Sequence, residues 1–406
     1  MNEQATIAAA KPAATPPIPF DTGLLDDLLD KAAIDALVVS SKHNIQYLIG
    51  GGYRFFFFSH FDAIGLSRYL PILVYLKGRP DRTTYIGHPM EAYERDLGKF
   101  WMPSIQPAAR GTIDAMQLAV DYLKGNAAGL KTIGVERAFL PADAEELLRN
   151  CLPGVKIVEA LAPLERLRAR KTPRELEYLR VASERVVDSM LAVIAEHGPG
   201  STKLELTGAL RREEVTRGLT FEYCLITTGT SLNRAPSDQV WGEGDILSLD
   251  SGGNYKGYIG DLCRMAIQGE PDAELEDLLG EIETIQMAAR KLIRAGARGG
   301  DIYLSAGEVI AKSSLGNSLE FVAHGMGLVS HEVPHLSNRA PVPYPASDAH
   351  SPLETGMVLS IETTIHHPRR GFIKLEDTVA VTDDGWQAFG DNGRGWNRGG
   401  TAVTKA

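Results

Sequence analysis

Four carboxylates in the second half of the chain have the spacing of two acidic β-hairpins. In the segment GDILSLDSGGNYKGYIGDLCRMAI, Asp250 and Asp261 lie on either side of a turn rich in Gly and Asn. The segment GMVLSIETTIHHPRRGFIKLEDTVAV repeats the arrangement, with Glu362 and Glu376 equidistant from residue 369 in its turn. If each hairpin is symmetric, its two acidic side chains lie roughly opposite each other across the strands.

Like charges that face each other across a hairpin need a compensating cation. Directly opposed Cβ atoms are about 4.5–5.5 Å apart, and two carboxylates at that distance are destabilising. The neighbouring residues are apolar, so the charges would also be poorly hydrated. A divalent metal ion is the economical partner for such a set. The alternative for either hairpin alone is that its acids alternate onto a solvent-exposed face.

A histidine completes a possible ligand set. Six of the ten histidines fall between residues 324 and 367, and His324 lies in the segment FVAHGMG, whose small residues let other groups approach the imidazole. Four carboxylates and one imidazole are hard, oxygen-rich ligands that suit two divalent ions, Mn(II) first, with Co, Zn or Fe also possible. Two ions about 3.5–4 Å apart could activate a bridging water and polarise the scissile group.

The segment His331-Glu332-Val333-Pro334-His335 matches the zinc motif H-E-x-x-H. That motif requires a helix, on which its two histidines share one face. Pro334 lies inside the motif and further prolines follow it, so we expect no helix and no zinc site of this kind here.

The elements that must position these residues divide the chain into two parts. Residues 1–20 are rich in Ala and Pro and are expected to form a flexible tail. Residues 21–168 alternate helix and strand patterns and predict an α/β domain without a phosphate-binding glycine loop. Thr172-Pro173-Arg174-Glu175 is a strong helix start, so a second domain is expected over 169–406. The helices expected in this domain span residues 172–196, 203–217, 272–296 and 301–313. Its strands are expected within 246–268 and 357–382.

The composition of the chain argues against several classes of protein. The formal net charge is −10, from 42 basic and 52 acidic residues, which argues against a nucleic-acid-binding protein. Three scattered cysteines without a C-x-x-C motif fit a reducing compartment, and neither a signal peptide nor a membrane-spanning segment is apparent. We therefore expect a cytoplasmic protein that does not act at a membrane.

The ordered set Asp250, Asp261, His324, Glu362 and Glu376 resembles the ligand pattern of the pita-bread metallohydrolases. This family includes Xaa-Pro dipeptidases, aminopeptidase P, methionine aminopeptidase and creatinase. The similarity covers residues 172–385, and the segment around Asn44-Ile45-Gln46-Tyr47 resembles the creatinase-type partner domain. It implies an α/β (α+β) fold: a creatinase-like N-terminal domain followed by a pita-bread domain with a curved antiparallel sheet.

The resemblance also implies roles for the residues. Asp261 and Glu376 would bridge two metal ions, Asp250 would hold one of them, and His324 with Glu362 would hold the other. Glu362 occupies the position of the family's proton-shuttling acid. His331 matches a second family histidine that contacts substrate and stabilises the tetrahedral intermediate, although a turn histidine bonded to the backbone is the alternative. Creatinase lacks these ligands, so their presence favours the metal-dependent branch.

Some positions depart from the peptidase pattern. Asn233 stands where these peptidases usually carry a histidine, and an amide cannot shuttle a proton at neutral pH. Thr363 and Thr364 replace the usual Pro-Gly after Glu362, and Lys374 stands where Arg is common. These changes concern the shell around the metal ligands, and they make strict specificity for proline dipeptides uncertain.

The run Tyr53–Phe58 offers a hint about substrate and assembly. In creatinase the corresponding segment reaches the partner subunit's active site, so the resemblance suggests a homodimer. If the segment lines the site, Phe56 and Phe58 favour an apolar or aromatic substrate and Arg54 could bind a carboxylate. A strand buried on both faces is the alternative.

Three functions remain open. The first is a dinuclear metal hydrolase that cleaves an amide C–N bond in a small substrate, most simply an Xaa-Pro dipeptide. The second is the same centre in a non-peptidase, which would act on a modified amino acid or small amide or catalyse a lyase reaction. The third is a catalytically inactive binding protein, against which the intact ligand set argues.

Overall fold

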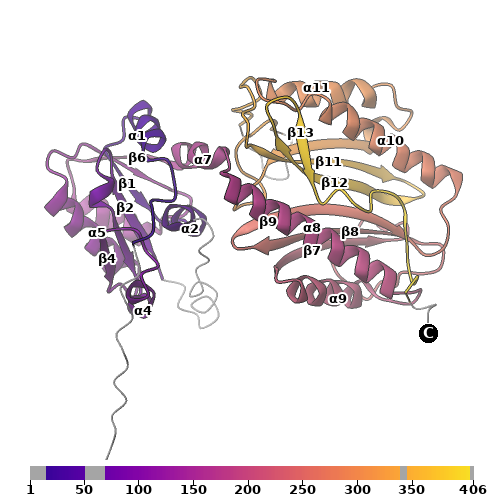
Figure 1. The fold of residues 1–406 in the computed structure, drawn as a ribbon, viewed down its shortest axis with the longest axis horizontal. Helices are drawn as coiled ribbons and strands as arrows, with labels where there is room; N and C mark the ends of the chain where they lie inside the picture. The colour runs from indigo at the N-terminus through magenta and orange to yellow at the C-terminus, as the bar shows by residue number, and fades with distance from the viewer. Residues whose placement is uncertain (1–14, 51–68, 339–344, 403–406) are drawn as a thin grey trace, which may run out of the picture. The chain divides into compact units, whose positions relative to one another are not determined.

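The computed structural model describes residues 15–50, 69–338 and 345–402, and the chain divides into two compact units, 1–167 and 168–406 (Figure 1). Arg54, Phe56 and Phe58 lie outside the described residues, as does most of the expected N-terminal tail. In the part of the chain that is described, no helix is both long and apolar enough to cross a membrane.

The first unit is built on a six-stranded mixed sheet in the order β4-β3-β2-β1-β5-β6. Its strands are β1 (Ala36–Val39), β2 (Ile72–Leu76), β3 (Thr84–Gly87), β4 (Ser104–Pro107), β5 (Thr132–Val135) and β6 (Lys156–Glu159). Its helices are α1 (Thr22–Lys31), α2 (Lys42–Gly50), α4 (Ala92–Asp96), α5 (Thr112–Asn126), α6 (Ala142–Cys151) and α7 (Leu161–Ala169). Every residue of β1 and β2 is buried, as expected for strands covered on both faces. The expected α/β architecture is confirmed.

The second unit contains an antiparallel sheet in the order β10-β11-β12-β9-β8-β7, with β13 paired to β12 and β14 paired to β9. Its strands are β7 (Thr220–Thr228), β8 (Ile246–Tyr255), β9 (Tyr258–Ile267), β10 (Leu319–Gly325), β11 (Val358–His367), β12 (Gly371–Val381), β13 (Trp386–Phe389) and β14 (Asn397–Arg398). Its helices are α8 (Pro173–Glu196), α9 (Lys203–Thr216), α10 (Ala273–Arg290) and α11 (Gly299–Ile310). The expected antiparallel-sheet domain is confirmed, and the capping box at Thr172 and Glu175 begins α8 as expected.

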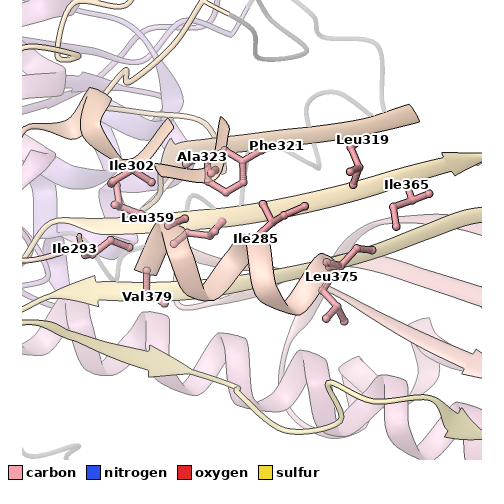
Figure 2. Packing of buried hydrophobic residues seen from close by; sticks show 14 of the residues in the cluster. Ile285, Ile293, Ile302, Leu319, Phe321, Ala323, Leu359, Ile365, Leu375 and Val379 are labelled. Carbon is pink, nitrogen blue, oxygen red and sulfur yellow. The ribbon is translucent and has the colours of Figure 1, made fainter. Parts of the chain in front are cut away.

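Strand alternation separates the core of this unit from its polar face. Leu359 and Ile365 of β11 and Leu375 and Val379 of β12 pack in one buried cluster with Ile285 of α10 (Figure 2). Since successive residues of a strand point to opposite faces, the even-numbered residues that alternate with them point away from this cluster. On β11 and β12 these intervening residues include the two acids Glu362 and Glu376.

Candidate active site

The two acidic hairpins form neighbouring parts of one sheet. On β11 and β12, Glu362 pairs directly with Glu376, as the symmetry of the sequence predicts. On β8 and β9, Asp250 pairs with Cys263 and Asp261 pairs with Gly252. The two aspartates, expected roughly opposite each other, are therefore offset from a direct pair.

The turn explains this shift. Tyr255 pairs with Tyr258, so the hairpin closes through the two residues Lys256 and Gly257. Both have positive φ, 53° and 100°, as a two-residue turn of this hand requires. The centre of the hairpin therefore lies one residue later than the midpoint of the two aspartates. Asp250 and Asp261 become diagonal neighbours that still share one face of the sheet.

The strand registers bring all five expected ligands to this face. Cys263 pairs with both Asp250 and Glu376, so one row across four strands runs Asp250, Cys263, Glu376, Glu362. His324 of β10 pairs with Ser360, which is two residues from Glu362 and therefore on the same face.

The glycines beside His324 allow the close approach that the sequence suggests. A Cβ atom on Gly325 would lie 2.4 Å from the carbonyl oxygen of Glu332, so the 332–334 segment packs directly on this strand. The H-E-x-x-H segment is not helical, as expected. Its Glu332 is buried and paired with Arg168 at 3.2 Å and Lys171 at 2.8 Å, which is a structural role.

Three of the ligands form a pocket for one cation. Donor atoms of Asp261, His324 and Glu376 all lie within 4.8 Å of one another, and the three residues are buried. The Oδ1 atom of Asp261 is buried without a hydrogen-bond partner, which is energetically unfavourable. Coordination to a metal ion would remove this unfavourable free energy. The Nε2 atom of His324 lies 3.2 Å from Glu362 Oε1, which adds a fourth donor beside the pocket. The residues fit a divalent ion that prefers oxygen and imidazole ligands.

A lysine lies among the remaining carboxylates. The Nζ atom of Lys374 lies 2.6 Å from Asp250 Oδ2, 2.6 Å from Glu362 Oε2 and 2.8 Å from Glu376 Oε2. Asp250 also pairs with the guanidinium of Arg234. The sequence placed Lys374 near the ligands, since it is two residues from Glu376 on β12, but did not predict that its ammonium contacts three of them.

Burial and neighbouring negative charges shift the pKa values of the acidic residues in the site. Burial raises the pKa of Asp261 to about 7, and the carboxylate of Asp250 contributes further. Burial and the charge of Asp261 also raise the pKa of Glu376 well above its usual range. Burial alone would raise the pKa of Glu362 as well, but the ammonium of Lys374 and the ring of His324 hold it below its usual range. Asp261 and Glu376 are therefore the two acids that most need a cation.

His331 lies directly against the ligand set. Its ring stacks on the ring of His324 with 3.7 Å between the centroids, and it lines the same pocket. Burial, with a smaller contribution from His324, lowers the pKa of His331 to about 4. The imidazole is therefore neutral at neutral pH.

The structure does not bring Asn233 to the ligands. Its side chain accepts a hydrogen bond from the amide of Ala235 at 3.0 Å, within its own exposed loop. The adjacent Arg234 lines the pocket instead and lies over the ring of Phe372 at 5.0 Å. The proposed contact between Asn233 and substrate stays a prediction.

Two more residues at this face escaped the sequence reasoning. Tyr223 of β7 lines the cavity, and burial together with the charge of Asp261 raises the pKa of its hydroxyl well above the usual range. Cys263 lies in the carboxylate row described above, with its sulfur 3.2 Å from Ser248 Oγ. Neither residue belongs to a recognisable metal motif, and β7 was not predicted. The position of Cys263 two residues after Asp261 was the available signal, because residues i and i+2 of a strand share a face.

These residues form the floor and walls of a small cavity. The described residues outline about 310 Å³, and the lining residues are Tyr223, Leu225, Arg234, Asp250, Asp261, Ser330, His331, Glu362, Lys374 and Glu376. A pocket near the lower end of the range for small-molecule sites, with convergent polar groups and perturbed acids, has the features of an enzyme active site.

Two acidic hairpins around such a pocket are typical of a metal-dependent hydrolase. Residues 177–383 match the model of metallopeptidase family M24, and residues 23–170 match the creatinase/prolidase N-terminal domain. The chain belongs to metallopeptidase family M24.

Individual relatives are more distant. The chain is 31% identical over 240 residues to a probable dipeptidase PepE of Mycobacterium bovis, an alignment that spans 57% of this chain and 61% of that protein. It is 22% identical over 371 residues to an Xaa-Pro dipeptidase of Pyrococcus horikoshii, covering 88% and 93% of the two chains. Among solved structures, an Xaa-Pro dipeptidase from Bacillus anthracis superposes with a TM-score of 0.76 at 20% identity, over 91% of this chain and 97% of that one. This last likeness concerns the fold.

Proposed function

We propose that the chain is a metal-dependent hydrolase that cleaves an amide C–N bond in a small substrate, with an Xaa-Pro dipeptide as the first candidate. The observation that carries the proposal is the convergence of Asp250, Asp261, Glu362 and Glu376 on one cavity of about 310 Å³, with His324 clustered beside Asp261 and Glu376. Membership of a metallopeptidase family and the dipeptidase names of several relatives support it.

A divalent ion would be held by Asp261, His324 and Glu376, with Glu362 beside it. The oxygen-rich donor set favours Mn(II), and Co, Zn or Fe are the other candidates. When bound, such an ion polarises a carbonyl group and makes water a better nucleophile at neutral pH.

Glu362 is the proposed proton carrier. Its side chain is 14% exposed, whereas those of Asp250 and Glu376 are 3% and 2% exposed. It is therefore the acid that substrate and water reach most easily from the cavity. As a carboxylate at neutral pH it can accept a proton from the attacking water and deliver it to the leaving nitrogen.

His331 is the proposed partner of the reacting carbonyl. A neutral imidazole donates one hydrogen bond without adding a positive charge next to the cation. Since His331 lines the cavity and stacks on His324, it can present an N–H to the oxygen on which negative charge develops.

Arg234 is the proposed site for a substrate carboxylate. Its side chain is 34% exposed at the cavity wall although its guanidinium pairs with Asp250. A dipeptide or an N-acyl amino acid would offer a carboxylate there. An apolar N-acyl amino acid is the second candidate substrate, because Tyr223 and Leu225 form an apolar part of the lining.

The test is turnover of a panel of Xaa-Pro dipeptides, other dipeptides and N-acyl amino acids by Mn-loaded enzyme and by Glu362→Gln. We expect kcat for the best substrate to fall by about 10²–10⁴-fold in the variant, the usual contribution of a general acid–base group. Glu320→Gln is the matched control, because Glu320 lies on the adjacent strand β10 with 56% of its side chain exposed. Unchanged kcat in Glu362→Gln would contradict the proposal, and turnover confined to non-proline substrates would favour the second candidate.

We further propose a cytoplasmic homodimer, on the resemblance to creatinase and the scattered, unpaired cysteines Cys151, Cys224 and Cys263. Sedimentation velocity at micromolar concentration checks the assembly, and a monomer throughout would contradict it.

A further inference from the structure

We infer that the ammonium of Lys374 takes the place of one of the two cations expected in this centre, so that the enzyme binds one divalent ion per chain. The inference rests on the proposed function, because it concerns the metal centre of that hydrolase. It departs from the two-ion expectation drawn from the sequence.

The contacts of Lys374 are those of a cation held by oxygen ligands. A lysine ammonium has three N–H donors, and here three different carboxylates lie within 2.8 Å of it. Its side chain is 4% exposed, so the charge is buried inside the ligand set. An ion in the same position would have to share Asp250, Glu362 and Glu376 with the ammonium at these distances.

The ligands separate into two groups around it. Asp261, His324 and Glu376 form the compact donor cluster, and Asp250 is absent from that cluster. Asp250 instead pairs with Lys374 and Arg234 through the same oxygen, Oδ2. The residue that would hold the first of two ions is therefore already neutralised by two side-chain cations.

The balance of charges in the centre also supports a single divalent ion. The centre holds four carboxylates, Asp250, Asp261, Glu362 and Glu376, and two cationic side chains, Lys374 and Arg234. The two negative charges that remain equal the charge of one divalent ion. A second ion would leave two positive charges in a buried site, which is costly without further anions.

The compact ammonium matters here. A lysine charge is a point at the end of a flexible stem, whereas a guanidinium is a broad planar fork that meets carboxylates edge-on. A Lys at this position can therefore stand between carboxylates as an ion does. Removing the side chain should free both the space and the charge, whereas replacing it with Met removes the charge and fills the space.

The experiment measures metal content of the full chain directly. Wild type, Lys374→Ala and Lys374→Met would be stripped, loaded with excess Mn(II), desalted, and examined by mass spectrometric metal analysis and by electron paramagnetic resonance. We expect one ion per chain with the spectrum of an isolated Mn(II) ion in the wild type and in Lys374→Met. We expect two ions with an exchange-coupled spectrum in Lys374→Ala.

Two coupled ions in the wild type would overturn the inference while leaving the proposed hydrolase intact. One ion in a folded Lys374→Ala would also overturn it, because the ammonium would then not be what excludes the second ion. Wild-type protein that binds no metal would instead contradict the proposed function itself. If Lys374→Ala does not fold, the wild-type stoichiometry and spectrum decide between one ion and two.

Discussion

The ring of Tyr223, which lines the cavity together with Asp261, packs over a position that has no side chain. A Cβ atom on Gly252, the residue paired with Asp261, would lie 2.3 Å from the edge of the Tyr223 ring. An added methyl group must therefore displace the ring, which lines the cavity together with Asp261. Gly252 contributes to the site because its lack of a side chain makes room for the ring of Tyr223.

We expect Gly252→Ala to lower kcat/KM by about 10²-fold, the effect of misplacing reacting groups by about 1 Å. Overpacking should cost only about 1–3 kcal/mol of stability, so circular dichroism should show a folded protein. Gly280→Ala is the control, because a Cβ atom there has no neighbour within 4 Å. Wild-type kcat/KM in Gly252→Ala would show that the position of Tyr223 is unimportant.

Some residues of the site could be predicted from the sequence and others could not. The five residues of the candidate metal site could be singled out because Asp, Glu and His are the residue types that bind divalent ions, and their order and spacing are specific. Arg234 and Tyr223 could not, because neither type indicates a metal site. Their positions depend on how β7 and the loop after it lie against β8.

At the scale of secondary structure, strand register decides which acids meet. The Glu362–Glu376 pairing followed from sequence symmetry, whereas Asp250 and Asp261 lie diagonally because the centre of their hairpin is one residue later than their midpoint. Turn type fixes register, and the two-residue turn at Lys256-Gly257 was not recognised. β10 was missed because it is short and ends in the glycine-rich segment around His324.

The packing of α9 on β8 includes a buried acid outside the site. Glu214 of α9 is fully buried, and its Oε1 lies 2.9 Å from Ser251 Oγ on β8. Burial raises the pKa of Glu214 from 4.5 to about 8. Between these values the native state keeps a proton that the unfolded state releases, so native stability falls as pH rises.

We expect Glu214→Gln to remove this dependence, because the amide keeps the shape without titrating. The free energy of unfolding of the variant, relative to wild type, should increase by up to about 1.4 kcal/mol per pH unit between pH 5 and 8. Urea denaturation at three pH values measures it, with Glu213→Gln as the control on the same helix. Parallel pH curves for wild type and Glu214→Gln would contradict the expectation.

At the scale of the whole catalytic unit, one buried aspartate joins elements that are far apart in sequence. Asp377 of β12 pairs with Arg264 of β9 at 2.9 Å, with Arg290 of α10 at 2.7 Å, and with Arg394 near the end of the described chain. Asp377 adjoins Glu376 but points to the opposite face. The network therefore fixes the strand that carries the ligand without entering the cavity.

We expect Asp377→Asn to destabilise the protein by about 3–5 kcal/mol, because it leaves buried guanidinium groups without their carboxylate. Asp391→Asn should cost less than about 1 kcal/mol, since Asp391 pairs with the same Arg290 at 3.1 Å but is 41% exposed. Thermal or urea unfolding compares the two. Equal, small effects would show that the network adds little to stability.

The two-unit organisation and the fold of each unit could be predicted, because strand and helix patterns and the Thr172 helix start are local signals. The buried arginine network could not, since Asp377 pairs with Arg264 and Arg290, which lie on other elements and far away in sequence.

We expect amide hydrolysis by this centre to require a divalent ion. The most direct measurement removes the ion with chelator, confirms its loss by metal analysis, and follows release of the free amino group from the best substrate of the Xaa-Pro and N-acyl panel before and after Mn(II) is restored. We expect turnover to disappear with the metal and to return with it, in the wild type but not in Glu362→Gln. Undiminished turnover by metal-free protein would contradict a metal-dependent hydrolysis.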